Sequence, residues 1–202
     1  MNFRYKFSIV LIVLGLISVI MSFGGKKSTT IPPEEILSRI SGGVHLLPAD
    51  DMAEILVNEA GMQSVDVRNP DRYKKASIPG AINIPISEIL ESKYESLFDD
   101  DSLKTVLYSD DELLSSQAWI LCSQKGIKNL YILAGGLAAW DSIVMNSEFE
   151  GETISAEQNA LFEKRYKARR LYLQWNAMPD SLKAGFFAVK QVRDKELVGG
   201  CE

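Results

Sequence analysis

The sequence predicts a three-layer α/β protein, with a parallel central sheet and helices on both of its faces. Short apolar segments typical of buried strands alternate with amphipathic segments typical of helices. The composition, 46% hydrophobic and 24% charged, is that of a globular domain. An uncharged run precedes this alternation and a polar, helical region follows it. We therefore predict four regions: residues 1–27, 28–43, 44–146 and 147–202.

The first region is predicted to hold a membrane anchor. Residues 7–23 contain no charge, with Arg4 before them and Lys26 and Lys27 after them. This length is near the lower limit for a membrane-spanning helix. No small-x-small cleavage site is evident, so we expect a single-pass anchor rather than a cleaved signal peptide. The amino terminus favours an N-in orientation, which places the following domain outside the cytoplasm, on the periplasmic side in a bacterium.

The second and third regions supply the alternating elements, beginning with a polar, proline-containing linker at residues 28–33. Apolar segments predict strands at residues 44–47, 64–68, 105–108 and 129–133, with a short extended piece within 78–85. Helical spacing predicts helices at residues 34–40, 48–57, 86–97 and 113–125, and another that contains Trp140. Local signals agree: Asp50 and Asp51 suit a helix start, and Gly126 suits a helix end.

The fourth region is predicted as a helical extension and tail. Ser155 has the character of a helix N-cap, and Pro179 ends the helix that follows it. Residues 164–170 read KRYKARR, with aromatic residues interleaved. Two interpretations remain open. The aromatic side packs on the domain while the basic side is solvated, or the segment rests on an anionic membrane surface or a partner.

Four motifs give the chain a resemblance to the rhodanese superfamily. They occur in the family's order as VDVR at 65–68, YKKASIPGAINIP at 73–85, VLY at 106–108 and AGG with a following tryptophan at 134–140. The resemblance implies a rhodanese-like domain over residues 44–146. We assign a structural role to the motif residues Asp66, Arg68, Pro79, Gly80, Gly135, Gly136 and Trp140.

The loop that carries catalysis in active members of this family is degenerate here. The family's catalytic cysteine is replaced by Ser109, and the loop continues as Asp110, Asp111, Glu112, Leu113 and Leu114. A serine cannot form a persulfide, and the three carboxylates repel an anionic sulfur donor. We interpret the acidic residues as helix caps rather than as a metal site, and the two leucines as the start of the helix's buried face.

The remaining reactive residues are few. The chain has two cysteines and one histidine, which excludes a zinc site of the usual Cys/His kind. We predict that Cys122 is a small core residue and that Cys201 is the only candidate reactive thiol. No cofactor or metal is predicted. The net charge of -5 gives no reason to expect nucleic-acid binding.

These observations favour a non-catalytic binding or scaffold module at a membrane, with a protein partner whose identity the sequence does not reveal. An alternative is a sulfurtransferase or thiol-redox protein that acts through Cys201 or through a partner's cysteine. A third hypothesis, a hydrolase at Ser109, is disfavoured because no base is evident near it in sequence.

Overall fold

The computed structural model describes residues 31–43, 45–58, 61–100, 103–148, 155–183 and 185. The predicted anchor at residues 7–23 and the candidate thiol Cys201 lie outside the described residues. Among the residues that are described, no helix combines the length and apolar character needed to cross a membrane.

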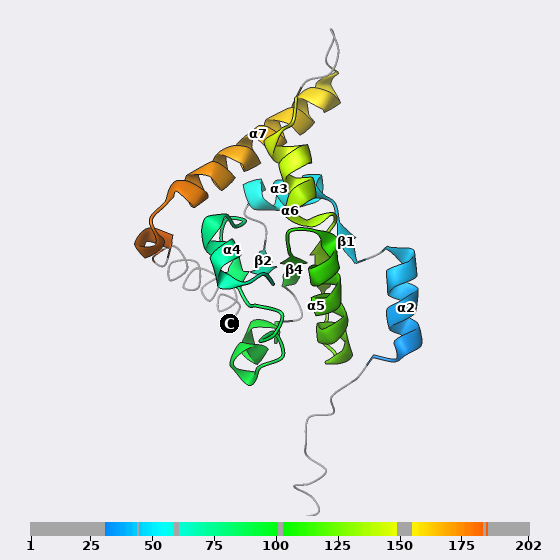
Figure 1. The fold of residues 1–202 in the computed structure, drawn as a ribbon. Coiled ribbons are helices and arrows are strands. Elements are labelled where there is room, and N and C mark those ends of the chain that lie inside the picture. Colours follow the sequence, from blue (N-terminus) through cyan, green and yellow to red (C-terminus); the bar gives the residue numbers. More distant parts are fainter. Residues whose placement is uncertain are drawn as a thin grey trace, which may run out of the picture.

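A five-stranded sheet forms the centre of the molecule, and every strand pair in it is parallel, as the sequence predicts (Figure 1). The spatial order is β1-β5-β4-β2-β3. The strands are β1 Leu46–Leu47, β2 Met62–Asp66, β3 Ile82–Asn83, β4 Lys104–Tyr108 and β5 Leu130–Leu133. In the register, Asp66 at the end of β2 lies beside Tyr108 at the end of β4. The loops that follow these two strands therefore leave the sheet at the same, carboxyl-terminal end of its strands.

Helices connect and follow the strands. They are α2 Pro33–Gly42, α3 Ala49–Asn58, α4 Pro70–Lys75, the 3-10 helix η1 Ser92–Leu97, α5 Glu112–Gln124, α6 Gly136–Trp140, the π-helix η2 Asp141–Met145 and α7 Ala156–Ala177. The predicted N-cap of α7 is present, because the Ser155 side chain accepts a hydrogen bond from the Gln158 amide. The Gln158 side chain in turn accepts a hydrogen bond from the Ser155 amide, which completes a capping box.

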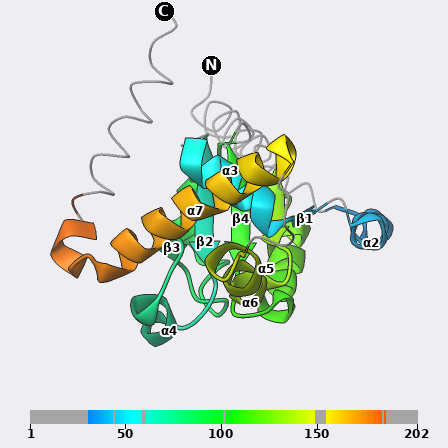
Figure 2. The same ribbon diagram turned by 90° about the horizontal axis from the view of Figure 1, so that it is seen from above.

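Two apolar cores lie on opposite faces of the sheet. On one face, residues of α3, α6, η2 and α7 pack together around Trp140 and Tyr108. On the other face, α5 packs through Trp119 and Cys122 onto strand residues such as Ile132. Figure 2 shows α7 running diagonally across the sheet beside α3. The predicted arrangement, with helices on both faces, is confirmed.

Three local predictions are corrected. Residues 86–97 do not form one helix, because successive i→i+3 hydrogen bonds make a turn at 86–90, followed by η1. An apolar spacing of three residues fits both arrangements, so the sequence did not separate them. Helix α4 was not predicted, since it buries no residue and has no apolar periodicity. Strand β2 ends at Asp66, two residues earlier than expected.

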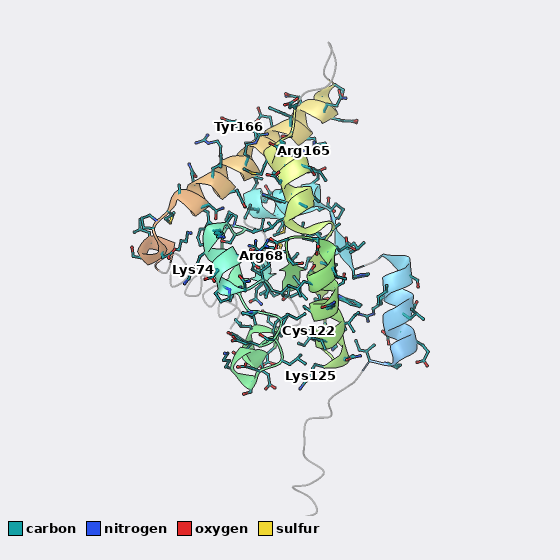
Figure 3. The ribbon with its side chains drawn as sticks, viewed as in Figure 1. Arg68, Lys74, Cys122, Lys125, Arg165 and Tyr166 are labelled. Carbon is teal, nitrogen blue, oxygen red and sulfur yellow. The ribbon has the colours of Figure 1, made fainter. Side chains whose placement is uncertain are left out.

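Helix α7 packs onto the domain. Ala168 and Trp175 are buried on its inner side, and the Arg165 guanidinium makes a two-bond ion pair with the Asp50 carboxylate at 2.6 and 2.7 Å. Lys164 pairs with Glu54. Figure 3 shows Arg165 and Tyr166 as neighbours on this helix, and Tyr166 is exposed. Several basic side chains of the 164–170 segment are therefore directed at the domain.

Candidate functional site

The candidate site lies at the carboxyl ends of the parallel strands, where β2 and β4 end. The segment after β2 carries Arg68, and the segment after β4 begins with Ser109. Both residues are buried. Ligand and catalytic groups of open α/β sheets gather at this end, because the loops after parallel strands converge there.

The hydroxyl of Ser109 is enclosed by its own loop. Its Oγ donates a hydrogen bond to the carbonyl oxygen of Asp111 and accepts one from the amide of Ser115 at 3.1 Å. The Ser115 hydroxyl lies 3.2 Å away. Ser109 is 1% exposed. The side chain thus contributes to closing the loop. It hydrogen-bonds two backbone groups and a second hydroxyl, none of which is a general base.

The three acidic residues of the loop have three different roles. Asp111 is the N-cap of α5, where its carboxylate accepts from the Leu113 amide at 3.0 Å. Glu112 accepts from the Gly135 amide at 2.9 Å and so ties α5 to the loop before α6. Asp110 bridges two arginines, with Oδ1 2.9 Å from Nη1 of Arg68 and Oδ2 2.8 Å from Nη1 of Arg72. Capping therefore describes Asp111, but not Asp110.

A buried ion pair fixes Arg68. Its Nε and Nη2 donate to the two carboxylate oxygens of Asp66, at 3.0 and 2.6 Å. Nη2 also donates to the carbonyl of Ala76 at 2.6 Å. Burial by itself would lower the pKa of Arg68, but the hydrogen bonds and charges of Asp66 and Asp110 outweigh it and raise that pKa. The guanidinium therefore stays charged and joins three segments of the chain.

Two further residues of the site were missed in the sequence. Arg72 reaches Asp110 from the exposed helix α4, and the pair Asn69-Pro70 was the available signal for that helix. Tyr108 accepts a hydrogen bond from the Ile78 amide at 3.1 Å. Burial, followed by the negative charge of Asp66, raises the pKa of Tyr108 well above its usual value. The phenol is therefore neutral at physiological pH.

The loop leaves one leucine exposed. Leu113 is 67% exposed, so the prediction that it begins the buried face of α5 is wrong. The buried stripe of α5 begins at Ser115 and continues through Ala118 and Trp119, and Leu113 lies off that stripe. Leu114 is partly buried against the core that contains Trp119.

Cys122, the cysteine within the described residues, does not lie at the loop. Cys122 is buried on α5, and burial raises its pKa to about 12. In Figure 3, Cys122 lies on α5 toward the end that carries Lys125, away from the Arg68 end of the site. The described residues also include no group of three or more His, Cys, Asp or Glu side chains placed to hold a metal ion.

Close packing at Gly136 leaves no room for a side chain at this position. Its φ is +60°, and a Cβ there would lie 2.7 Å from the carbonyl oxygen of Ser109 and 2.6 Å from that of Asp111. The carbonyl oxygen of Ser109 instead accepts a backbone hydrogen bond from α6, where the Leu137 amide nitrogen lies 2.9 Å away. The glycine therefore allows α6 to rest directly on the 109–114 loop.

Comparison with known proteins gives similarities that cover part of the chain. Residues 48–143 match the Rhodanese family, described as the rhodanese-like domain. The human "Centrosomal protein of 41 kDa" is 36% identical over 81 residues, which cover 36% of this chain and 21% of that protein. The Bacillus subtilis protein YqhL is 32% identical over 78 residues, 39% of this chain and 60% of that protein. The chain thus spans less than two thirds of each of these relatives.

Solved structures resemble the chain at lower identity. The thiosulfate sulfurtransferase of Pseudomonas aeruginosa is 21% identical with a TM-score of 0.48, and the match covers 64% of this chain and 26% of that one.

The contact at Gly136 generates a stability prediction. Gly136→Ala adds a side chain at a positive φ and against two backbone oxygens, and we expect it to cost about 3 kcal/mol of unfolding free energy. Gly43→Ala is the matched control, because Gly43 has a φ of +61° but no atom within 4 Å of its Cβ position. The control should cost only about 1–2 kcal/mol, the conformational cost of the left-handed backbone. Urea unfolding measures both, and equal costs would contradict the packing argument.

Proposed function

We propose that the chain, whose residues 48–143 match the rhodanese-like domain family, is a non-catalytic binding or scaffold module tethered at a membrane. One observation carries the proposal. The residue at the family's nucleophile position is Ser109, whose buried hydroxyl is already hydrogen-bonded within its own loop. Sulfur transfer by this family requires a thiolate at that position, and a hydroxyl cannot carry the sulfur.

The electrostatics of the loop support the same conclusion. The N-terminus of α5 is a potential anion site, because helix amides point outward there. The Leu113 and Ser115 amides, however, already donate to Asp111 and Ser109. Asp110 adds a negative charge that pairs with Arg68 and Arg72. An incoming thiosulfate would have to displace these internal acceptors and approach a carboxylate.

A binding role is favoured by what the loop leaves exposed. Leu113 projects from the first turn of α5 as one of the most exposed large apolar side chains in the described residues. In sequence it comes after Asp111, and Asp110, which pairs with Arg72, lies three residues before it, so charged residues of both signs belong to the same loop region. This combination suits a protein partner, because an apolar anchor surrounded by polar contacts is the usual pattern of an interface.

The membrane tether rests on the sequence. The uncharged run at residues 7–23 motivates it, with the protein's domain outside the cytoplasm.

The catalytic part of the proposal predicts an inactive protein. We expect the full chain in detergent to show no thiosulfate:cyanide sulfurtransferase turnover above a heat-killed control. Ser109→Cys alone should restore little, because Asp110 and the engaged amides of α5 remain. Thiocyanate formation measures both proteins. Turnover by the unaltered chain that survives Cys201→Ser would refute a non-catalytic role.

The binding part predicts a partner that depends on the loop. We expect Leu113→Arg to abolish co-purification of proteins from a detergent extract of the cells that make this protein. Leu37→Arg is the control, since Leu37 on α2 is 64% exposed, compared with 67% for Leu113. Quantitative mass spectrometry compares the captured proteins. If both substitutions leave the same proteins bound, the loop is not the binding surface.

The tether predicts behaviour in membrane fractions. The protein should stay in the pellet through a carbonate wash, because an apolar run of this length is held by the bilayer and not by charge. Deleting residues 7–23 should release it into the supernatant. Recovery of the unaltered protein mainly as a soluble form that lacks this run would show that the segment is cleaved.

A further inference from the structure

The end of α7 makes three hydrogen bonds to one residue of the loop that leads into β3. The Asn176 side chain pairs with the backbone of Ser77, accepting from its amide at 2.9 Å and donating to its carbonyl at 3.0 Å. The indole Nε1 of Trp175 donates to the Ser77 hydroxyl at 3.0 Å. Ser77 and Trp175 are both buried. A segment almost a hundred residues away in sequence thus holds this loop at both of its backbone groups.

The attachment continues into the candidate site. The residue before Ser77 is Ala76, whose carbonyl accepts from Nη2 of Arg68 at 2.6 Å. Nη1 of the same guanidinium donates to Asp110 at 2.9 Å. One peptide unit and two sets of hydrogen bonds therefore connect α7 to the 109–114 loop. Tyr172, one turn earlier on α7, packs on Trp140 with the ring centroids 6.1 Å apart, so the helix also touches the core beneath the site.

The two halves of α7 are held by different contacts. The helix up to its middle is fixed by the Arg165–Asp50 and Lys164–Glu54 ion pairs and by the buried Ala168. The last turn is fixed to Ser77 by Trp175 and Asn176. Helix ends open locally at lower free energy than helix centres. The last turn can therefore separate from Ser77 while the first half of the helix stays in place.

We propose that α7 is a C-terminal strap, whose attachment to Ser77 holds the 109–114 loop in its closed arrangement. When the last turn separates, the Ala76 carbonyl is free to move, and Arg68 and Asp110 lose the constraint that fixes them. A partner that binds the loop in its closed arrangement, where Leu113 is exposed, is then favoured by an attached α7 and opposed by a released one. This inference rests on the proposed function for what the loop binds, and it adds the regulation of that surface.

Hydrogen exchange on the full chain in detergent micelles tests the coupling. Asn176→Ala removes both backbone contacts to Ser77. We expect the Leu113 and Ser115 amides to exchange at least about fivefold faster, with protection of the Ile132 amide in the central sheet unchanged. Asn159→Ala is the matched control, because Asn159 is an exposed asparagine in the first turn of the same helix. It should change none of these rates.

The reciprocal variant separates coupling from a merely local effect. Asp110→Asn acts at the loop, and if the loop and the end of α7 are coupled it should also speed exchange at the Asn176 and Ala177 amides. Asp51→Asn, at an exposed acid of α3, should not. Faster exchange confined to the altered end, in either direction, would overturn the strap.

A milder variant keeps the test decisive if Asn176→Ala does not fold. Trp175→Phe retains an aromatic ring but removes the donor to the Ser77 hydroxyl, and we expect a smaller acceleration at the same loop amides. Unchanged loop exchange in a folded Trp175→Phe would equally overturn the proposal. None of these measurements needs a partner, so the strap can fail while the binding function stands, and the reverse.

Discussion

The ion pair between Asp66 and Arg68 is the interaction on which the arrangement of the site depends. Both side chains are buried, and a buried charge is tolerated only when its partners are complete. The guanidinium meets this requirement by donating to the carboxylate of Asp66, to Asp110 and to the carbonyl of Ala76. Each of these acceptors belongs to a different segment, so satisfying one cation brings together the end of β2, the loop after α4 and the loop after β4.

In the 109–114 loop, side chains of the protein itself occupy the groups that could bind an external anion. A loop that binds an external anion needs vacant amides and unpaired cations, whereas here the chain supplies the acceptors itself. Asp111 accepts from the Leu113 amide of α5, Ser109 accepts from the Ser115 amide, and Asp110 pairs with two arginines. The groups that could hold an external anion are thus already engaged within the chain. This supports the proposed binding role independently of the residue type at position 109.

The C-terminal helix α7 is packed against the domain and is hydrogen-bonded to the site. It completes one of the two cores through Ala168 and Tyr172, and it contacts the site through Ser77. Several basic residues of its KRYKARR segment face acidic residues or carbonyls of the domain, while Tyr166 and Leu173 stay exposed. The helix therefore uses several of its basic residues to bind the domain. The face that remains exposed to a surface or partner is narrower than the sequence implies.

The sequence alone determined the fold class, the parallel sheet and most of the helices. These follow from local periodicity, capping signals such as Ser155, and motif order. Tertiary structure alone decided that Asp110 binds Arg68, 42 residues away, that Asn176 binds Ser77, and that Leu113 is exposed. The physical reason is that local patterns set the conformation of a segment, whereas the partner of a polar side chain depends on which distant segment the packed sheet brings beside it.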